Sequence, residues 1–256
     1  DDVLAVLQPI WQEKAETAKR LRGRLEKVLD FARVRGWRTG ENPARWKGHL
    51  DKILPAPSRL TRGHHPAMPY KEVPEFVSEL RNRPSTSAQA LEFTILTGAR
   101  SGETLGARWS EIDLETKVWT LPGARMKTGQ EHVVPLTDRC IEILRERAEG
   151  AMGEFVFGSP KGKPLSNMAM SQLLKGMRDG FVPHGFRSSL RDWAGDMTTF
   201  PREIAEAALA HQVGSSVERS YRRSSALEQR RALMTAWADF VEGRRAAVIT
   251  LHAARA

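Results

Sequence analysis

Tyr221 is a candidate nucleophile, because arginines surround it in a chain that otherwise uses little tyrosine. The only other tyrosine is Tyr70, and Tyr221 alone is flanked by arginines, at Arg219, Arg222 and Arg223. A free phenol has a pKa near ~10, and adjacent positive charge favours the phenolate that attacks as a nucleophile. Guanidinium groups also grip phosphate oxygens in pairs and keep their charge. The segment therefore predicts covalent phosphoryl chemistry on DNA, although an amphipathic surface tyrosine is the commoner role.

Phosphoryl transfer also needs positive charge at the equatorial phosphate oxygens, and Arg100 and Arg187 are the candidates. Each stands where a helix is predicted to begin, so backbone N–H groups would point at the same anion. Glu103 follows Arg100 by three residues and is expected to hold its guanidinium in a supporting role rather than to act as an acid or base. Alone, either arginine would be one surface cation among 40 lysines and arginines.

His184, His211 and Lys127 would supply the groups that move protons. Histidine titrates near neutral pH, so either ring could donate a hydrogen bond to a phosphate oxygen or carry a proton. Lys127 is expected near a hairpin tip, from which its ammonium could reach a leaving oxygen. A histidine is more often a structural core or surface residue, and a lysine in a turn is more often simply solvated. Only the whole set of residues therefore favours catalysis.

The sequence predicts neither a metal nor a cofactor. His64 and His65 lack a third ligand at a recognisable spacing. The stretch from Gly158 to Lys163 superficially resembles a nucleotide-binding loop, but its spacing is one residue short and Pro164 replaces the required Ser or Thr. Two arginines at the phosphate would make a metal unnecessary.

The composition indicates a polyanionic partner. The chain carries 40 Lys+Arg against 31 Asp+Glu, a net charge of +9 with a pI near 10.0, as is typical of nucleic-acid binders. Cys140 is the only cysteine, which excludes an internal disulfide and fits a reducing, cytoplasmic location. No apolar run approaches the ~20 residues of a membrane helix. Because the chain begins with Asp-Asp-Val, we expect a fragment of a longer protein.

A small basic helical unit is predicted first. Apolar residues recur at helical spacing from Thr17 to Arg35, and Gly36 is a natural stop. A second helix is expected from Asn42 to about Leu54, because Asn42 can cap it and Pro43 suits its first turn. Cations on the first helix are candidate DNA contacts, although plain solvation explains them equally well. These candidates are Lys19, Arg20 and Arg24.

Four prolines from Pro55 to Pro69 interrupt all periodicity, which predicts an extended interdomain linker at residues 58–69. The predicted domains are therefore residues 1–57 and residues 70–256. The linker carries two further candidate DNA contacts, Arg59 and Arg62.

The second domain is predicted to be mainly helical around a small sheet. Three short β-rich runs, at residues 112–114, 118–121 and 132–136, predict antiparallel strands. Ser101 is expected to cap a short helix that contains Glu103. The other helices are expected at residues 74–80, 87–97, 138–149, 166–177, 184–196, 201–210, 216–222 and 227–241.

In this order the candidate residues resemble the catalytic series of the tyrosine recombinases, the phage-type integrases. The likeness is carried by TGARSGETLGARW around Arg100, MKTGQEHVVPL around Lys127, PHGFRSSLRDWA around Arg187 and LAHQVGSSVERSY up to Tyr221. TAKRLRGRLEKVLDFA and ENPARWKGHL are similar to the later part of the core-binding domain in prophage and genomic-island integrases. Ala210 departs from the glycine that usually precedes the family's histidine.

The resemblance implies a mainly α fold with a small three-stranded antiparallel sheet, in two domains that form a C-shaped DNA clamp. It implies a site-specific recombinase in which Tyr221 forms a 3′-phosphotyrosine and releases a 5′-hydroxyl. Arg100, Arg187 and His211 would stabilise the transition state, Lys127 would protonate the leaving oxygen, and His184 would assist as a base. The implied partners are double-stranded DNA at an attachment site, further copies in a tetramer on DNA, and accessory DNA-bending proteins, with no membrane.

Three questions stay open at this stage. A type IB topoisomerase would share the tyrosine mechanism without pairing DNA sites, and a non-enzymatic DNA-binding regulator would keep only the basic surface. The helix at 227–241 could pack in cis, or dock in trans on a neighbouring copy as in family members. From the resemblance, we expect the first helices of the core-binding domain and an arm-binding domain to lie outside this sequence, so strand cleavage is expected of it more directly than complete recombination.

Overall fold

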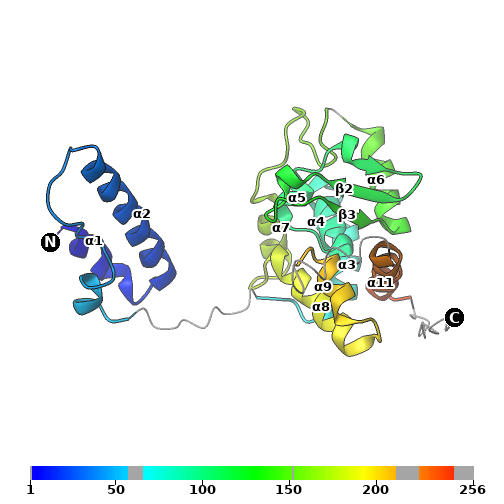
Figure 1. The fold of residues 1–256 in the computed structure, drawn as a ribbon. Helices are drawn as coiled ribbons and strands as arrows, with labels where there is room; N and C mark the ends of the chain where they lie inside the picture. The colour runs from blue at the N-terminus through cyan, green and yellow to red at the C-terminus, as the bar shows by residue number, and fades with distance from the viewer. Residues whose placement is uncertain (1, 57–65, 152, 212–224, 245–256) are drawn as a thin grey trace. The chain divides into compact units, whose positions relative to one another are not determined.

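The chain divides into two compact units, residues 1–63 and residues 64–256. The computed structural model describes residues 2–56, 66–151, 153–211 and 225–244, shown as coloured ribbon in Figure 1. The boundary between the units falls within the predicted linker.

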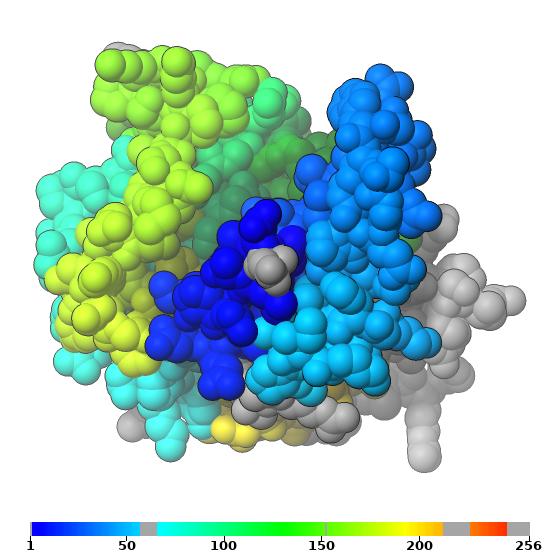
Figure 2. Space-filling model, turned by 90° about the vertical axis from the view of Figure 1, so that its left-hand side faces the viewer, coloured from blue at the N-terminus to red at the C-terminus, as the bar shows by residue number. Residues whose placement is uncertain are grey.

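The smaller unit is built on two helices, α1 (Asp2–Trp11) and α2 (Ala15–Val34), which pack side by side (Figure 1). Helix α1 was not predicted from the sequence. Trp11 joins α1 to the later part of the unit, because its indole stacks on Trp46 at 5.3 Å between ring centroids and donates to the Pro55 carbonyl at 2.8 Å. In the space-filling view the dark blue of α1 lies against the lighter blue of the unit's last residues (Figure 2).

The helix predicted from Asn42 to Leu54 is wrong. This segment consists of turns and a single 3₁₀ turn, η1 (Leu50–Lys52). The Asn42 side chain accepts from the backbone N–H of Ala44 and so closes a turn, while its amide donates to α2. Gly48 then takes a left-handed conformation with φ of +75°, which a continuing helix does not allow. The capping signal was real, but it caps a turn.

The larger unit gathers its helices around α4 (Thr86–Thr97), which is buried along almost its whole length. Ser85 caps α4 by accepting from the Ala88 N–H, and Gly98 ends it with φ of +62°. The surrounding helices are α3 (Val73–Arg81), α5 (Ser101–Leu105), α6 (Asp138–Glu149), α7 (Ala169–Met177), α8 (Phe186–Met197), α9 (Arg202–Ala208) and α11 (Ser225–Val241). The 3₁₀ turns are η2 (Tyr70–Glu72), η3 (Trp109–Glu111), η4 (Gly123–Arg125) and η5 (Pro183–Gly185).

The predicted three-stranded antiparallel sheet is confirmed, in the order β1 (Ile112–Asp113), β2 (Val118–Leu121) and β3 (His132–Pro135). On β2, Trp119 and Leu121 are fully buried, and Trp119 packs on Phe93 of α4 at 5.5 Å between ring centroids. Leu121 pairs with His132, so the chain between β2 and β3 projects from the sheet as a hairpin loop. Lys127 lies in that loop, as predicted.

Helix α11 packs in cis, against the core of its own chain. Leu233, Met234 and Trp237 are fully buried, and the Trp237 indole donates to the Ile95 carbonyl of α4 at 2.9 Å. Trp237 also packs on Trp193 of α8, with 5.1 Å between ring centroids. The helix predicted at residues 216–222 lies outside the described residues.

Residues 66–69 belong to the larger unit rather than to a free linker. The Pro66 carbonyl accepts from the Val182 N–H, and Met68 is buried with its carbonyl bonded to the Ser189 hydroxyl. Gly185 fits here because a Cβ would lie 2.4 Å from the Pro66 carbonyl oxygen. None of the described helices combines the length and apolarity that a bilayer crossing would require.

Candidate active site

Arg100 lies at the end of α4, where the chain turns into α5. Its backbone N–H and one guanidinium N–H both donate to the Glu103 carboxylate, each at 2.8 Å. Glu103 is buried, whereas about a quarter of the Arg100 side chain is exposed. Glu103 therefore accepts from the backbone N–H of Arg100 and holds its guanidinium, which is the supporting role expected of it. The prediction that Ser101 caps α5 is wrong, because Ser101 is the first helical residue and Arg100 is the cap.

Arg187 is buried at the start of α8 and joins three parts of the site. One guanidinium nitrogen donates to the Gly98 carbonyl, and another donates to the Leu209 carbonyl and lies 3.1 Å from Nε2 of His211. Burial, together with the nearby charge of Arg100, lowers the pKa of Arg187 to about 10. The group is still a cation at neutral pH. It is fixed in place by the ends of two other helices.

His211 is positioned by the way α9 ends. The Ala210 N–H bonds back to the Ala207 carbonyl and the His211 N–H to the Glu206 carbonyl, which is the Schellman arrangement for a helix C-terminus. That motif needs a left-handed residue, and Ala210 has φ of +50°. Alanine in place of glycine at position 210 thus strains the backbone but still forms the turn. His211 follows directly and meets Arg187.

Glu206 is a site residue that sequence analysis missed. It is 7% exposed, and its carboxylate lies 2.5 Å from Nδ1 of His211 and 2.8 Å from the Arg191 guanidinium. Burial raises its pKa, but the hydrogen bond from His211 and the charge of Arg191 outweigh burial and lower it. Glu206 is an ordinary glutamate in a helix by sequence. Only its position five residues before His211, across the helix end, signals the contact.

His132 and Arg230 are two further groups that sequence analysis left unused. Burial, then the charge of Arg230, lowers the pKa of His132 to about 4, and its ring hydrogen-bonds the backbone of Ala208 near the end of α9. Arg230 of α11 donates to the Val133 carbonyl at 2.7 Å. A neutral histidine and a half-buried arginine thus connect β3 to α9 and α11 beside the arginine pair.

The loop that carries Lys127 is anchored to α5 by Arg125. Arg125 donates to the Glu103 carbonyl at 2.8 Å and pairs with the Glu111 carboxylate, which also accepts from the Trp119 indole at 3.0 Å. Lys127 itself is exposed in the turn. The anchor brings the base of the loop to the helix that begins at Arg100.

The remaining candidates differ in what can be said of them. His184 is exposed in η5, one turn before Arg187. The cations Lys19, Arg20 and Arg24 are exposed on α2, and Arg20 pairs with Glu16 at 2.9 Å. Three candidates lie outside the described residues: Tyr221, Arg59 and Arg62.

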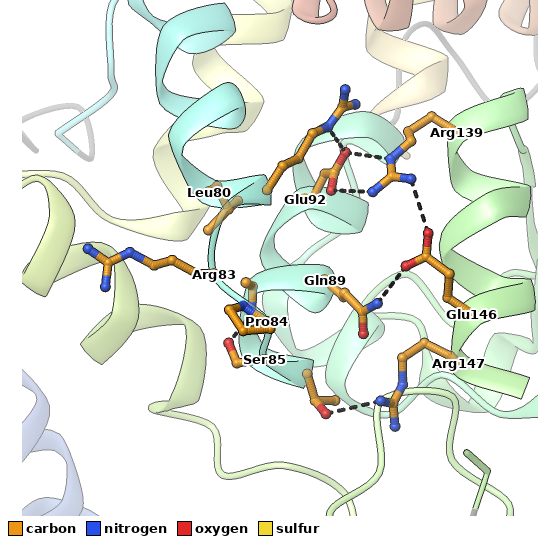
Figure 3. A pocket seen from close by; sticks show the side chains of 12 residues that line it. Leu80, Arg83, Pro84, Ser85, Gln89, Glu92, Arg139, Glu146 and Arg147 are labelled. Carbon is orange, nitrogen blue, oxygen red and sulfur yellow. Dashed lines mark hydrogen bonds and ion pairs between the residues drawn. The ribbon is translucent and has the colours of Figure 1, made fainter. Parts of the chain in front are cut away.

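A hollow of about 400 Å³ in the larger unit includes none of these candidates (Figure 3). Among its lining residues, the buried Glu92 accepts from Arg81 at 2.6 Å and from Arg139 at 2.9 Å, and Arg139 also pairs with Glu146. These paired charges tie α3, α4 and α6 together. Within the described ranges, no cluster of three or more His, Cys, Asp or Glu side chains is placed to hold a metal ion.

The phage integrase family matches residues 67–228, and the phage integrase central domain matches residues 1–49. Prophage integrase IntA of Escherichia coli K12 is 33% identical over 94% of this chain and 58% of its own length. Prophage integrase IntZ of the same strain is 32% identical over 94% of this chain and 59% of its own length. The chain thus spans about three fifths of these relatives.

The fold has been seen before in a lambda integrase tetramer bound to a Holliday junction. The TM-score is 0.59 at 20% identity, over 85% of this chain and 62% of that one. This likeness confirms the mainly helical architecture with its small sheet. The chain belongs to the phage integrase family, since that family matches most of its length. It is a member of the tyrosine recombinase class.

Proposed function

We propose that the chain is the core-binding and catalytic part of a site-specific DNA recombinase that integrates or excises a mobile element. The observation that carries the proposal is the convergence of Arg100, Arg187 and His211 from the ends of three helices. Two guanidinium groups and an imidazole at one place form a site for a single phosphate. The family membership and the DNA-bound relatives support the same substrate.

The proposed reaction is attack by the Tyr221 oxygen on the scissile phosphorus. The phenol loses its proton, with His184 assisting as base, as a tyrosyl O–P bond forms and the bond to the 5′ oxygen breaks. Lys127 delivers a proton to that 5′ oxygen, so a 5′-hydroxyl leaves and a 3′-phosphotyrosine remains. The phosphodiester energy is conserved in the new ester, and another strand's 5′-hydroxyl can reverse the step.

Arg100, Arg187 and His211 would stabilise the charge that gathers on the equatorial oxygens in the transition state. Burial and backbone hydrogen bonds hold Arg187 in place before DNA arrives, so little reorganisation is needed during the reaction. Glu103 does the same for Arg100. The charge stabilisation comes from guanidinium groups, so we expect cleavage to proceed in EDTA.

The larger assembly is proposed from the relatives. We infer that both units contact double-stranded DNA and that they are joined by the proline-rich segment that precedes Pro66. Four copies would assemble on paired attachment sites, with accessory bending proteins, in the cytoplasm. Lys19, Arg20, Arg24, Arg59 and Arg62 are the proposed phosphate contacts outside the catalytic site.

A covalent-capture experiment tests the function. The protein is incubated in EDTA with a pool of nicked duplexes whose centres are randomised, denatured, and freed of uncoupled DNA. We expect DNA that stays attached to the wild-type protein and is absent with Tyr221→Phe, and its sequence will define the preferred site. Attachment with no sequence preference, together with relaxation of any supercoiled plasmid, would instead indicate a topoisomerase. Salt-sensitive binding without attachment would indicate a regulator.

A further inference from the structure

We propose that Glu206 is a positioning residue that makes His211 donate to the scissile phosphate as an imidazolium cation. The inference rests on the proposed function and assigns a task to a side chain that acts through His211. Its basis is a pair of contacts on opposite sides of one ring. Glu206 lies at Nδ1, and Arg187 lies at Nε2.

The backbone fixes the pair before the side chains do. The Schellman turn bonds the His211 N–H to the Glu206 carbonyl at 2.9 Å, which places both residues on one side of the helix end. The side chains then meet at 2.5 Å between Nδ1 and the carboxylate. In most Schellman turns an apolar contact accompanies this geometry. Here a buried carboxylate and an imidazole occupy it.

The carboxylate dictates where the ring carries its proton. An ionised carboxylate accepts but cannot donate, so Nδ1 must bear a hydrogen. The pKa of Glu206 is lowered, which keeps it ionised at neutral pH. A neutral ring then has a bare Nε2, and that atom faces the guanidinium of Arg187 at 3.1 Å, from which it can accept.

Donation to a phosphate oxygen therefore requires a second proton on the ring. With Nδ1 committed to Glu206, Nε2 gains a hydrogen only in the imidazolium form. A phosphodiester that enters beside Arg187 favours that form, because it brings negative charge to a ring that otherwise faces a cation. Arg187 keeps its bonds to the Gly98 and Leu209 carbonyls throughout. The site thus takes up a proton as the phosphate arrives.

The other charges around the ring make Glu206 necessary. Arg187 faces Nε2, and Arg191 of α8 and Arg202 of α9 face the carboxylate, at 2.8 and 3.7 Å. Arg100 and Glu103 of α5 act on Arg187. The neutral His132 of β3 bonds the backbone of α9 at Ala208. Without the Glu206 carboxylate, the ring's nearest charged neighbours would be arginines, and the imidazolium form would be disfavoured.

The test is the pH profile of strand cleavage in Glu206→Gln. Glutamine keeps an acceptor oxygen for Nδ1–H and removes only the charge. Single-turnover cleavage of the captured site, built as a nicked duplex, is measured from pH 5.5 to 9. We expect the alkaline loss of cleavage to begin roughly one to two pH units lower than in the wild type, as for other close charge partners. Cleavage at pH 8 then falls by about tenfold or more, while DNA affinity stays within about twofold.

Glu203→Gln is the matched control, because Glu203 lies on the same helix and is exposed. It makes the same charge change away from the ring, and its profile should overlay that of the wild type. Arg191→Gln provides an opposite perturbation. Removing that cation leaves the Glu206 charge less neutralised, so the alkaline loss should begin at higher pH.

The outcomes separate this inference from the function on which it rests. If Glu206→Gln lowers cleavage by the same factor at every pH, Glu206 has only a structural role and the proposal fails. A pH profile of Glu206→Gln that matches the wild type also rejects the proposal. Should Glu206→Gln not fold, judged by its melting curve, the direction of the shift in Arg191→Gln decides, and no shift there rejects the proposal. Absence of any adduct with the wild type would instead reject the proposed function.

Discussion

At the scale of single residues, the site depends on side chains that are held before any substrate arrives. Arg187 shows this most clearly, since two backbone carbonyls and an imidazole contact its guanidinium. Burying such a cation is costly unless its donors are satisfied. The helix ends that supply those carbonyls also carry Arg100 and His211. Local backbone geometry and catalytic geometry are therefore linked at one side chain.

Arg187→Lys tests whether this fork is needed. A lysine keeps the charge but offers a compact ammonium in place of a planar fork, so it cannot hold both carbonyls and face a phosphate. We expect cleavage to fall by about 10²-fold or more, as on loss of an oxyanion donor, with DNA affinity changed by less than about threefold. Covalent capture and gel-shift titration measure the two quantities. Equal losses in both would make Arg187 a binding residue only.

His132 gives a pH-dependent stability with a defined sign. Its pKa is about 4 in the folded chain against 6.5 for the free ring, so the unfolded chain binds the extra proton between these values. Stability contributed at neutral pH is therefore lost as the pH falls from 6.5 toward 4. The free energy of unfolding is measured in urea at pH 7, 6 and 5. Between pH 7 and pH 5 it should fall by roughly 2 kcal/mol less in His132→Gln than in the wild type. Parallel losses would show that His132 titrates normally.

Residue type and order were enough to single out Arg100, Arg187 and His211, which the structure places at the ends of neighbouring helices. Their motifs are local, and each sits at a helix end that composition reveals. Glu206 and His132 could not be predicted in this way. Their partners lie across a helix end or on another element, and neither a glutamate in a helix nor a histidine in a strand signals such a contact.

At the scale of elements, helix ends place the chemistry. Gly98 ends α4 before Arg100, and the turn after α9 precedes His211. Arg125 ties the Lys127 loop to α5. Periodicity predicted most helices of the larger unit to within a few residues, because apolar stripes persist over several turns. In the smaller unit, the capping signal at Asn42 wrongly predicted a helix, because the Asn42 side chain bonds to the backbone in a turn instead.

Ala210→Gly tests the strain in the turn before His211. An L-residue in the left-handed region costs about 1–2 kcal/mol, and replacing it with glycine removes that strain. Part of this stabilisation is offset, because glycine has more conformational freedom in the unfolded chain. We expect a net stabilisation of roughly 0.5 to 1 kcal/mol in the unfolding transition, with cleavage unchanged. Ala207→Gly, within α9, is the control and should be destabilising. A destabilised Ala210→Gly would mean that the turn is not strained.

At the scale of the whole molecule, a basic chain is divided into two units, each with its own core. The proline-rich segment was interpreted as a linker between two domains, and the boundary between the units falls within it. The sequence predicted that the smaller unit is basic and helical, but it did not predict how the unit packs internally. Trp11 and Trp46 lie 35 positions apart, so no local pattern pairs them. The +9 net charge favours DNA but does not say which cations meet it.

The cations of α2 can be tested through salt. Lys19 and Arg24 are exposed, and neither forms an ion pair within the described part of the chain. If both contact phosphates, replacing them with glutamine should lower the slope of log affinity against log salt by roughly 2, since each contact contributes about 0.9. Fluorescence anisotropy at several salt concentrations measures it. Lys71→Gln together with Arg83→Gln, which carries the same charge change in the larger unit, gives the comparison. An identical slope in the wild type and in Lys19→Gln/Arg24→Gln would exclude these contacts.

The central claim is that one tyrosine becomes joined to a DNA 3′ end, and peptide mapping tests it most directly. The denatured adduct is digested with nuclease and trypsin, and the nucleotide-bearing peptide is sequenced by mass spectrometry. The account predicts a single modified peptide, with a 3′-linked nucleotide on Tyr221 and a free 5′-hydroxyl on the released strand. A modification on Tyr70 or on any other side chain, or a 5′-linked nucleotide, would contradict it.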